Sequence, residues 1–206
     1  MMGNSEKREL LALKNAKDSF VKGNHKVLAE ASGAYYDSES NTVESIYMGR
    51  RYLIHCADCD ISPIGHSFHV SDMEQTLILH NLLTATGRKL SGRLVSFRDL
   101  PKGGENYYSA FEKRCIIPLL KTFGHEPERI YKALSVIPGE KSTYGDASVC
   151  IQVLPCFPVT YVIWGTDEEF PASASVLFDA FSTDYLPVED IAISASFGAY
   201  AILKNT

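Results

Sequence analysis

The sequence lacks two features that would each mark a class of protein. No run of about 18 consecutive apolar residues occurs, so no membrane-spanning helix is expected. Lys and Arg are scattered along the chain rather than gathered in a stripe, and the formal net charge of the 206 residues is -5. Binding through phosphate neutralisation needs a basic surface. We therefore expect neither a nucleic-acid partner nor a membrane partner.

Targeting signals and a disulfide framework are also missing. The first twenty residues lack the uninterrupted apolar core of a signal peptide. The five cysteines are odd in number and have no disulfide-like spacing. These absences predict a cytoplasmic protein with reduced thiols.

The usual catalytic motifs are absent as well. The chain contains no G-x-S-x-G, no H-E-x-x-H, no G-x-G-x-x-G and no P-loop. No Ser or Cys stands beside a matching base in the sequence. The sequence therefore assigns no reaction, and whether the protein is an enzyme stays open.

The composition is that of an ordinary globular protein. Hydrophobic residues make up 45% of the chain and charged residues 22%, which is enough to bury a substantial core. No repeat, linker or low-complexity tract interrupts it. We expect a single domain over residues 1–206.

Helix and strand patterns are mixed along the chain. Apolar spacing predicts helices over residues 5–21, 25–33, 71–87, 107–123, 126–137, 172–182 and 187–204. The 107–123 helix is expected to be interrupted or to end near Pro118. Short β-type runs predict a small antiparallel meander over residues 42–64, a strand over 92–100 and a hairpin of 147–155 with 159–165. The hairpin is apolar on both faces, which favours a central position. The fold class is therefore α+β, with a mainly antiparallel or mixed sheet packed against several helices.

Three adjacent carboxylates, Asp167, Glu168 and Glu169, follow the apolar strand that ends at Trp164. They could hold a hard cation such as Mg²⁺, receive a cationic ligand, or supply an acid or base. They could also simply begin the expected helix, since acids interact favourably with a helix N-terminus. Trp164 and the three carboxylates are candidate ligand-binding residues.

A Cys-x-x-Cys pair, Cys56 and Cys59, lies in a predicted turn directly after His55. Two thiolates at this spacing can chelate Zn²⁺, and His66 and His69 downstream would complete a Cys₂His₂ set. The spacing is shorter than that of a zinc finger. The alternative is a surface hairpin with incidental thiols.

His80 lies in the middle of the helix expected over residues 71–87, on an apolar face. Imidazole there could act as an acid, a base or an axial metal ligand, and it is the candidate ligand if a tetrapyrrole binds. A core histidine bonded to the backbone or to a Tyr is the alternative.

The stretch "SFRDLPKGGENYY" contains a turn-rich loop. Gly103 and Gly104 would let the backbone approach a ligand closely, while Arg98 offers charge and Tyr107 a stacking surface. A simple turn is the alternative, because two glycines alone do not define a phosphate site.

Several of these stretches together resemble a known family. "WGTDEEFPASASVLFD", "YLPVEDIA", "LVSFRDLPKGG", "YYSAF" and "LILHNLL" are similar to segments of the uncharacterised domain-of-unknown-function family 3786 of anaerobic bacteria and archaea. The resemblance covers nearly the whole chain and implies no established activity.

Some members of that family carry an added cysteine-rich module of the kind found in corrinoid iron–sulfur proteins. The resemblance thus implies corrinoid or one-carbon chemistry and an iron–sulfur or corrinoid protein partner, although this chain has no closely spaced four-cysteine run. The leading hypothesis is a cofactor-binding or accessory protein, with one pocket formed by the acidic stretch, the 98–108 loop and the His80 helix. The alternatives are a metal-dependent enzyme using Asp167–Glu169 and a protein interaction module without a ligand.

Overall fold

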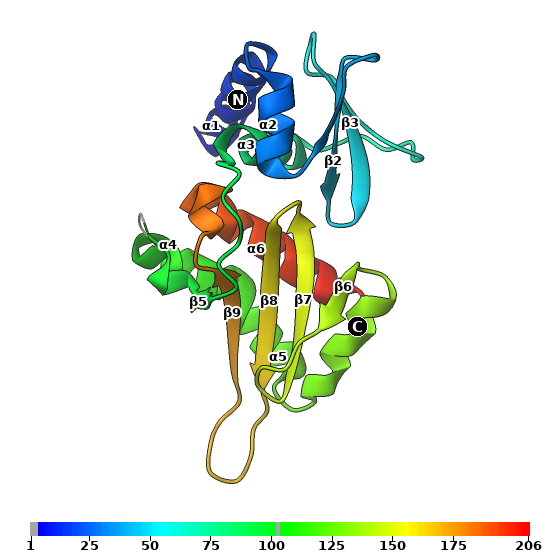
Figure 1. The fold of residues 1–206 in the computed structure, drawn as a ribbon. Helices are drawn as coiled ribbons and strands as arrows, with labels where there is room; N and C mark the ends of the chain where they lie inside the picture. Colours follow the sequence, from blue (N-terminus) through cyan, green and yellow to red (C-terminus); the bar gives the residue numbers. More distant parts are fainter. Residues whose placement is uncertain (1–3, 102–103) are drawn as a thin grey trace. The chain divides into compact units, whose positions relative to one another are not determined.

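The computed structural model describes residues 4–101 and 104–206, and its fold is drawn in Figure 1. The chain forms two compact units. The first comprises the residues up to Lys89 together with Leu154–Cys156 and Asp184–Leu186, and the second comprises the remainder. The predicted α+β class is confirmed, since both units combine helices with an antiparallel sheet. The expectation of one domain stays a prediction.

The first unit combines three helices with a four-stranded antiparallel meander in the order β1-β2-β3-β4. Its helices are α1 (Asn4–Val21), α2 (His25–Ser32) and α3 (Asp72–Thr84), and its strands are β1 (Tyr35–Asp37), β2 (Thr42–Tyr47), β3 (Arg50–His55) and β4 (Ile61–Pro63). Helix α3 packs against both other helices and against β2. The predicted capping box is present, because the Ser71 side chain accepts from the Glu74 N–H and Glu74 accepts from the Ser71 N–H.

The second unit is built on a five-stranded antiparallel sheet in the order β5-β9-β8-β7-β6. The strands are β5 (Leu94–Ser96), β6 (Gly139–Lys141), β7 (Ala147–Leu154), β8 (Phe157–Trp164) and β9 (Ser173–Asp179). The central position predicted for the β7–β8 hairpin is confirmed, because β8 lies in the middle of the sheet and is buried along most of its length.

Helical segments cover one face of this sheet. They are α4 (Gly104–Phe111), a π-helical turn (Glu112–Ile116), α5 (Ile117–Phe123), α6 (Val188–Lys204), and the 3₁₀ segments Phe97–Asp99 and Pro127–Ser135. A further 3₁₀ segment, Ser182–Asp184, follows β9. Figure 1 shows α5 and α6 lying across β8, which both helices contact. The π-turn precedes Pro118, whose ring would clash with the carbonyl of Arg114 in a regular α-helix. The helix therefore continues through the proline by widening one turn.

An aromatic cluster forms the core between β9 and the helices. The rings of Phe97 and Phe111 stack at 4.3 Å between centroids, and Phe178 of β9 lies 5.9 Å from Phe97. All three side chains are fully or almost fully buried. Val176 and Phe178 are both buried and stand two residues apart, so the strand conformation places them on the same face of the sheet.

The helix predicted over residues 172–182 is wrong, since Ser173–Asp179 is strand β9. β9 pairs with β8 from Trp164↔Ser173 to Val159↔Phe178 and with β5 on its other side. Pairing on both sides satisfies the backbone of this segment and buries its large residues, which outweighs local helix propensity. The helix predicted over 126–137 is a 3₁₀ segment, and the strand predicted over 92–100 continues into a 3₁₀ turn after Ser96.

None of the helices that the structure describes combines the length and hydropathy needed to cross a membrane.

Candidate functional site

The acidic stretch lies in the loop that joins β8 to β9, not at the start of a helix. The hairpin loop, residues 165–172, begins after Trp164 and ends before its cross-strand partner Ser173. The interpretation of the three carboxylates as a helix start is therefore wrong, since the segment that follows is a strand.

Asp167 organises this loop. Its Oδ1 accepts hydrogen bonds from the backbone N–H of Phe170 at 2.6 Å and of Glu169 at 2.8 Å. The same two bonds, that of Phe170 first, hold the pKa of the Asp167 carboxyl below its usual value. The Asp167 N–H in turn donates to the Phe170 carbonyl at 3.1 Å. The loop is thus closed on itself, and Asp167 is ionised at neutral pH.

Two further bonds attach the loop to the body of the second unit. The Gly165 N–H donates to Asp146 Oδ2 at 2.7 Å, and the Thr166 N–H donates to the Gly124 carbonyl at 2.9 Å. Asp146 directly precedes β7, and Gly124 directly follows α5. Segments far apart in the sequence therefore fix the position of the loop.

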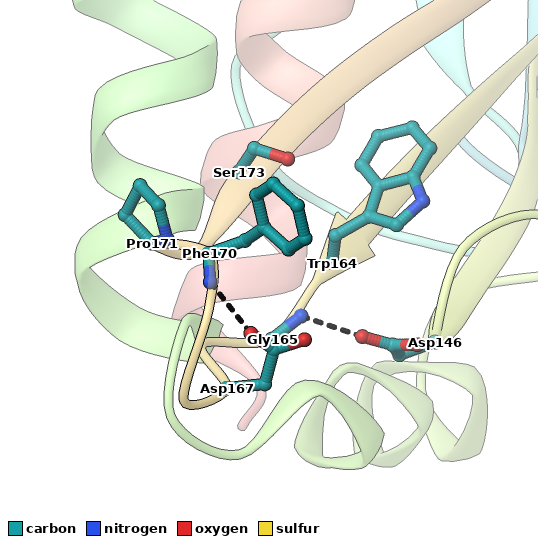
Figure 2. A pocket seen from close by; sticks show the side chains of 7 residues that line it. All are labelled: Asp146, Trp164, Gly165, Asp167, Phe170, Pro171 and Ser173. Atoms are coloured by element: carbon teal, nitrogen blue, oxygen red, sulfur yellow. Dashed lines mark hydrogen bonds between the residues drawn. The ribbon is translucent and has the colours of Figure 1, made fainter.

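A solvent-open depression of about 540 Å³ lies beside this loop. We call it the hairpin depression; its lining residues are Asp146, Trp164, Gly165, Asp167, Phe170, Pro171 and Ser173. Figure 2 shows their side chains and the bonds made by Asp146 and Asp167. Trp164 is 39% exposed and Phe170 is 65% exposed, so two large rings remain accessible to solvent. Trp164 is three residues beyond Tyr161, whose hydroxyl meets α6, and so points to the opposite face of the sheet.

The structure does not bring the three carboxylates of the acidic stretch to one point. Asp167 lines the hairpin depression, whereas Glu168 and Glu169 do not and are exposed to solvent. No group of three or more His, Cys, Asp or Glu side chains in residues 4–101 and 104–206 is arranged to hold a metal ion. Within the described residues, Asp167, Glu168 and Glu169 therefore do not form a coordination site for a divalent cation.

Cys56 and Cys59 lie in the hairpin turn between β3 and β4, in the first unit. Both cysteine side chains are buried, whereas His66 and His69 are exposed. Burial raises the pKa of the Cys59 thiol to about 12 and also raises that of Cys56. Zinc binds thiolates, and these four residues do not form a metal-holding group in the described structure.

His80 lies in α3, as predicted, and its side chain is half-buried. Its helix belongs to the first unit, whereas Trp164 and Asp167 belong to the second. His80 lines none of the depressions described for the second unit.

The 98–108 segment departs from its predicted role. Gly103 lies outside the described residues. Gly104 begins α4, and a Cβ added to it would overlap the Phe97 carbonyl, so the close approach is to the protein's own backbone.

Arg98 lies over the Tyr108 ring at 3.7 Å and within 3.8 Å of Glu105. Tyr107 lines a separate hollow of about 140 Å³ against α6.

Within the described residues of the second unit, the acidic stretch and the 98–108 segment do not line one depression. Tyr107 and Asp167 line depressions that share no residue. They lie toward opposite ends of β9, because Phe111, which lines the Tyr107 hollow, lies 6.1 Å from Phe178 near one end, whereas Trp164 pairs with Ser173 at the other.

Three residues important to this region were missed by sequence reasoning. Asp146 and Phe170 join the hairpin depression, and Asp179 supports the far end of β9. Asp146 directly precedes β7, and its N–H donates to the Ile163 carbonyl at 2.9 Å. The predicted β7–β8 hairpin, which brings the start of β7 beside the end of β8, was therefore the available signal for Asp146. Phe170 directly follows the acidic stretch. An aromatic residue adjacent to an acidic turn was the sequence signal that could have identified it as a site residue.

The fold and this site define an α+β protein with two antiparallel sheets and an open, aromatic and acidic depression at a hairpin loop. The profile of the domain of unknown function DUF3786 matches residues 24–201, and the chain belongs to this family. The match confirms the resemblance seen in the motifs around Trp164 and His80. Comparisons with curated proteins and with solved structures give no match.

Proposed function

We propose that the protein binds a small molecule in the hairpin depression. The observation that carries this proposal is the pair of exposed rings, Trp164 and Phe170, at a hollow of about 540 Å³. Small-molecule sites are typically concave, have volumes of roughly 300–1,000 Å³, and combine apolar rings with a few polar groups. Exposing large rings to water has a free-energy cost that a ligand would offset.

The fixed geometry of the loop supports the proposal. Bonds from Gly165 to Asp146, from Thr166 to Gly124 and within the 167–170 turn hold the walls in place before any ligand arrives. A preorganised site loses less conformational entropy on binding than a flexible loop does.

The hairpin depression offers no side chain suited to be the axial ligand of a corrinoid or other tetrapyrrole. The seven residues that line it include no His, Cys or Met, which are the side chains that most often ligate such metals. The link to corrinoid or one-carbon metabolism stays a prediction from the family resemblance, as does an iron–sulfur or corrinoid protein partner. His80 remains the candidate ligand for that chemistry.

The proposal is tested by filling the depression. Ser173 is exposed and lies opposite Trp164, so Ser173→Phe should place a ring in the hollow. We expect a small-molecule library screened by saturation-transfer NMR to yield hits that bind the wild type and lose at least tenfold in affinity in this variant. Ser19→Phe, at an exposed position of α1, is the matched control and should leave binding unchanged.

Two results would contradict the proposal. One is a library without any hit on the wild type, which would favour a protein interaction module. The other is a set of hits whose binding is equal in the Ser173→Phe and Ser19→Phe variants.

A further inference from the structure

The charge around the hairpin depression is of one sign. Asp146 and Asp167 line it, Glu168 and Glu169 follow in the same loop, and its seven lining residues include no Lys or Arg. Neither Asp146 nor Asp167 forms an ion pair within residues 4–101 and 104–206. The field in the depression therefore favours a positively charged occupant.

Each lining carboxylate keeps one oxygen for a ligand. Asp146 uses Oδ2 to accept from the Gly165 N–H, and Asp167 uses Oδ1 to accept from Glu169 and Phe170. In the part of the chain that the structure describes, Asp146 Oδ1 and Asp167 Oδ2 have no hydrogen-bond partner. The two groups are thus positioned by the backbone and still able to accept.

The aromatic rings of Trp164 and Phe170 add a second means of binding a cation, beside the carboxylates. Trp164 and Phe170 are both accessible at the depression, and an aromatic face attracts an ammonium or guanidinium group within about 6 Å of its centroid. Neither ring is in an aromatic stack or a cation–π contact among the described residues. A neutral apolar ligand would use the rings but not the carboxylates.

We propose that the occupant of the hairpin depression is an organic cation, an ammonium or guanidinium group on a short apolar body. Its charge lies against Asp146 and Asp167, and its body lies against the rings of Trp164 and Phe170. This inference rests on the proposed small-molecule function and names the class of ligand.

Trp164 is the single tryptophan of the chain, so its fluorescence reports on this depression alone. The probes are two cations, each with a neutral compound of the same shape: choline with 3,3-dimethylbutan-1-ol, and butylguanidinium with butylurea. We expect at least one cation to change the Trp164 emission in a saturable way and to bind at least tenfold more tightly than its neutral counterpart.

Charge-removing variants locate the effect. Asp146→Asn and Asp167→Asn keep an oxygen for the same backbone N–H groups, so each removes the charge while retaining the loop bonds. We expect each to weaken cation binding about tenfold, with the affinity for the neutral compound unchanged. Glu168→Gln, in the same loop but outside the depression, is the control and should change the affinity by less than about twofold.

The two proposals fail in different ways. Equal binding of each cation and its neutral counterpart, or equal effects of the Asp167→Asn and Glu168→Gln variants, would overturn the cation assignment and leave small-molecule binding in place. If the cations and the neutral compounds all leave Trp164 emission unchanged, the cation assignment is overturned, and the library screen with Ser173→Phe then decides the proposed function independently.

Discussion

Asp179 shows how much one buried carboxylate determines at the end of a strand. It is 2% exposed, and it accepts hydrogen bonds from the backbone N–H groups of Gly92 at 2.8 Å, Phe181 at 2.9 Å and Ser91 at 3.1 Å. The Ser91 hydroxyl adds a further bond at 3.0 Å. Burial alone would raise the pKa of Asp179, but these bonds together outweigh it and hold the pKa below its usual value. The carboxylate thus ties the segment before β5 to the end of β9.

We expect Asp179→Asn to lower the free energy of unfolding by about 2 kcal/mol at pH 7, because hydrogen bonds to a charged acceptor are stronger than those to a neutral amide. The folded-state pKa lies below the unfolded value, so the charge stabilises the fold above pH of about 4 and ceases to do so as pH falls through the lower folded pKa. The difference between wild type and variant should therefore shrink in acid.

Urea unfolding at pH 7 and at successively lower pH values measures this difference. Asp18→Asn, at an exposed position of α1, is the control and should be neutral throughout. A difference that stays constant down to pH 2 would show that Asp179 acts through packing rather than through its charge.

At the scale of elements, the contact between β8 and α6 depends on the absence of a side chain. Gly198 is buried in α6, and a Cβ added to it would overlap the hydroxyl of Tyr161. That hydroxyl donates to the Ala195 carbonyl at 2.9 Å, so it cannot move away without losing a buried bond. The glycine lets the helix approach the central strand closely.

We expect Gly198→Ala to destabilise the protein by about 1–3 kcal/mol. In an exposed helix this change would be favourable by roughly 1 kcal/mol, but here overpacking against Tyr161 outweighs the helix propensity. Thermal and urea unfolding measure the effect.

The double variant Tyr161→Phe with Gly198→Ala is the control for this mechanism. Removing the hydroxyl relieves part of the overlap, so the two changes together should cost less than the sum of the single changes. Additive effects would mean that the clash with Tyr161 is not the cause.

At the scale of the whole molecule, the family match and the first compact unit begin at different residues. The match begins at residue 24, whereas the first unit includes α1, which packs along α3. Phe20 of α1 is fully buried, and its carbonyl lies 2.9 Å from His25 Nε2. A helix outside the family match therefore completes the core of this unit.

We expect Phe20→Ala to lower the free energy of unfolding by about 3–5 kcal/mol, because it removes a buried ring and leaves a cavity. Leu11→Ala is the matched control on the same helix. Leu11 is 57% exposed, so its loss should change stability by less than about 0.5 kcal/mol. Similar values for the two variants in urea unfolding would show that α1 is not part of the cooperative core.

The sequence by itself determined the features that depend on neighbours along the chain. The capping box of Ser71 and Glu74, the helix over Val188–Lys204, the α+β class and the buried β7–β8 hairpin follow from local spacing and were predicted correctly. The family was recognised from short local motifs for the same reason.

Only the tertiary structure decided what depends on distant partners. Ser173–Asp179 is a strand because β8 and β5 satisfy its backbone on both sides, although its local pattern favours a helix. The position of the 165–172 loop also depends on Gly124, outside the hairpin, whose carbonyl accepts from the Thr166 N–H. Backbone pairing and side-chain convergence are long-range interactions, so a local sequence pattern leaves them undetermined.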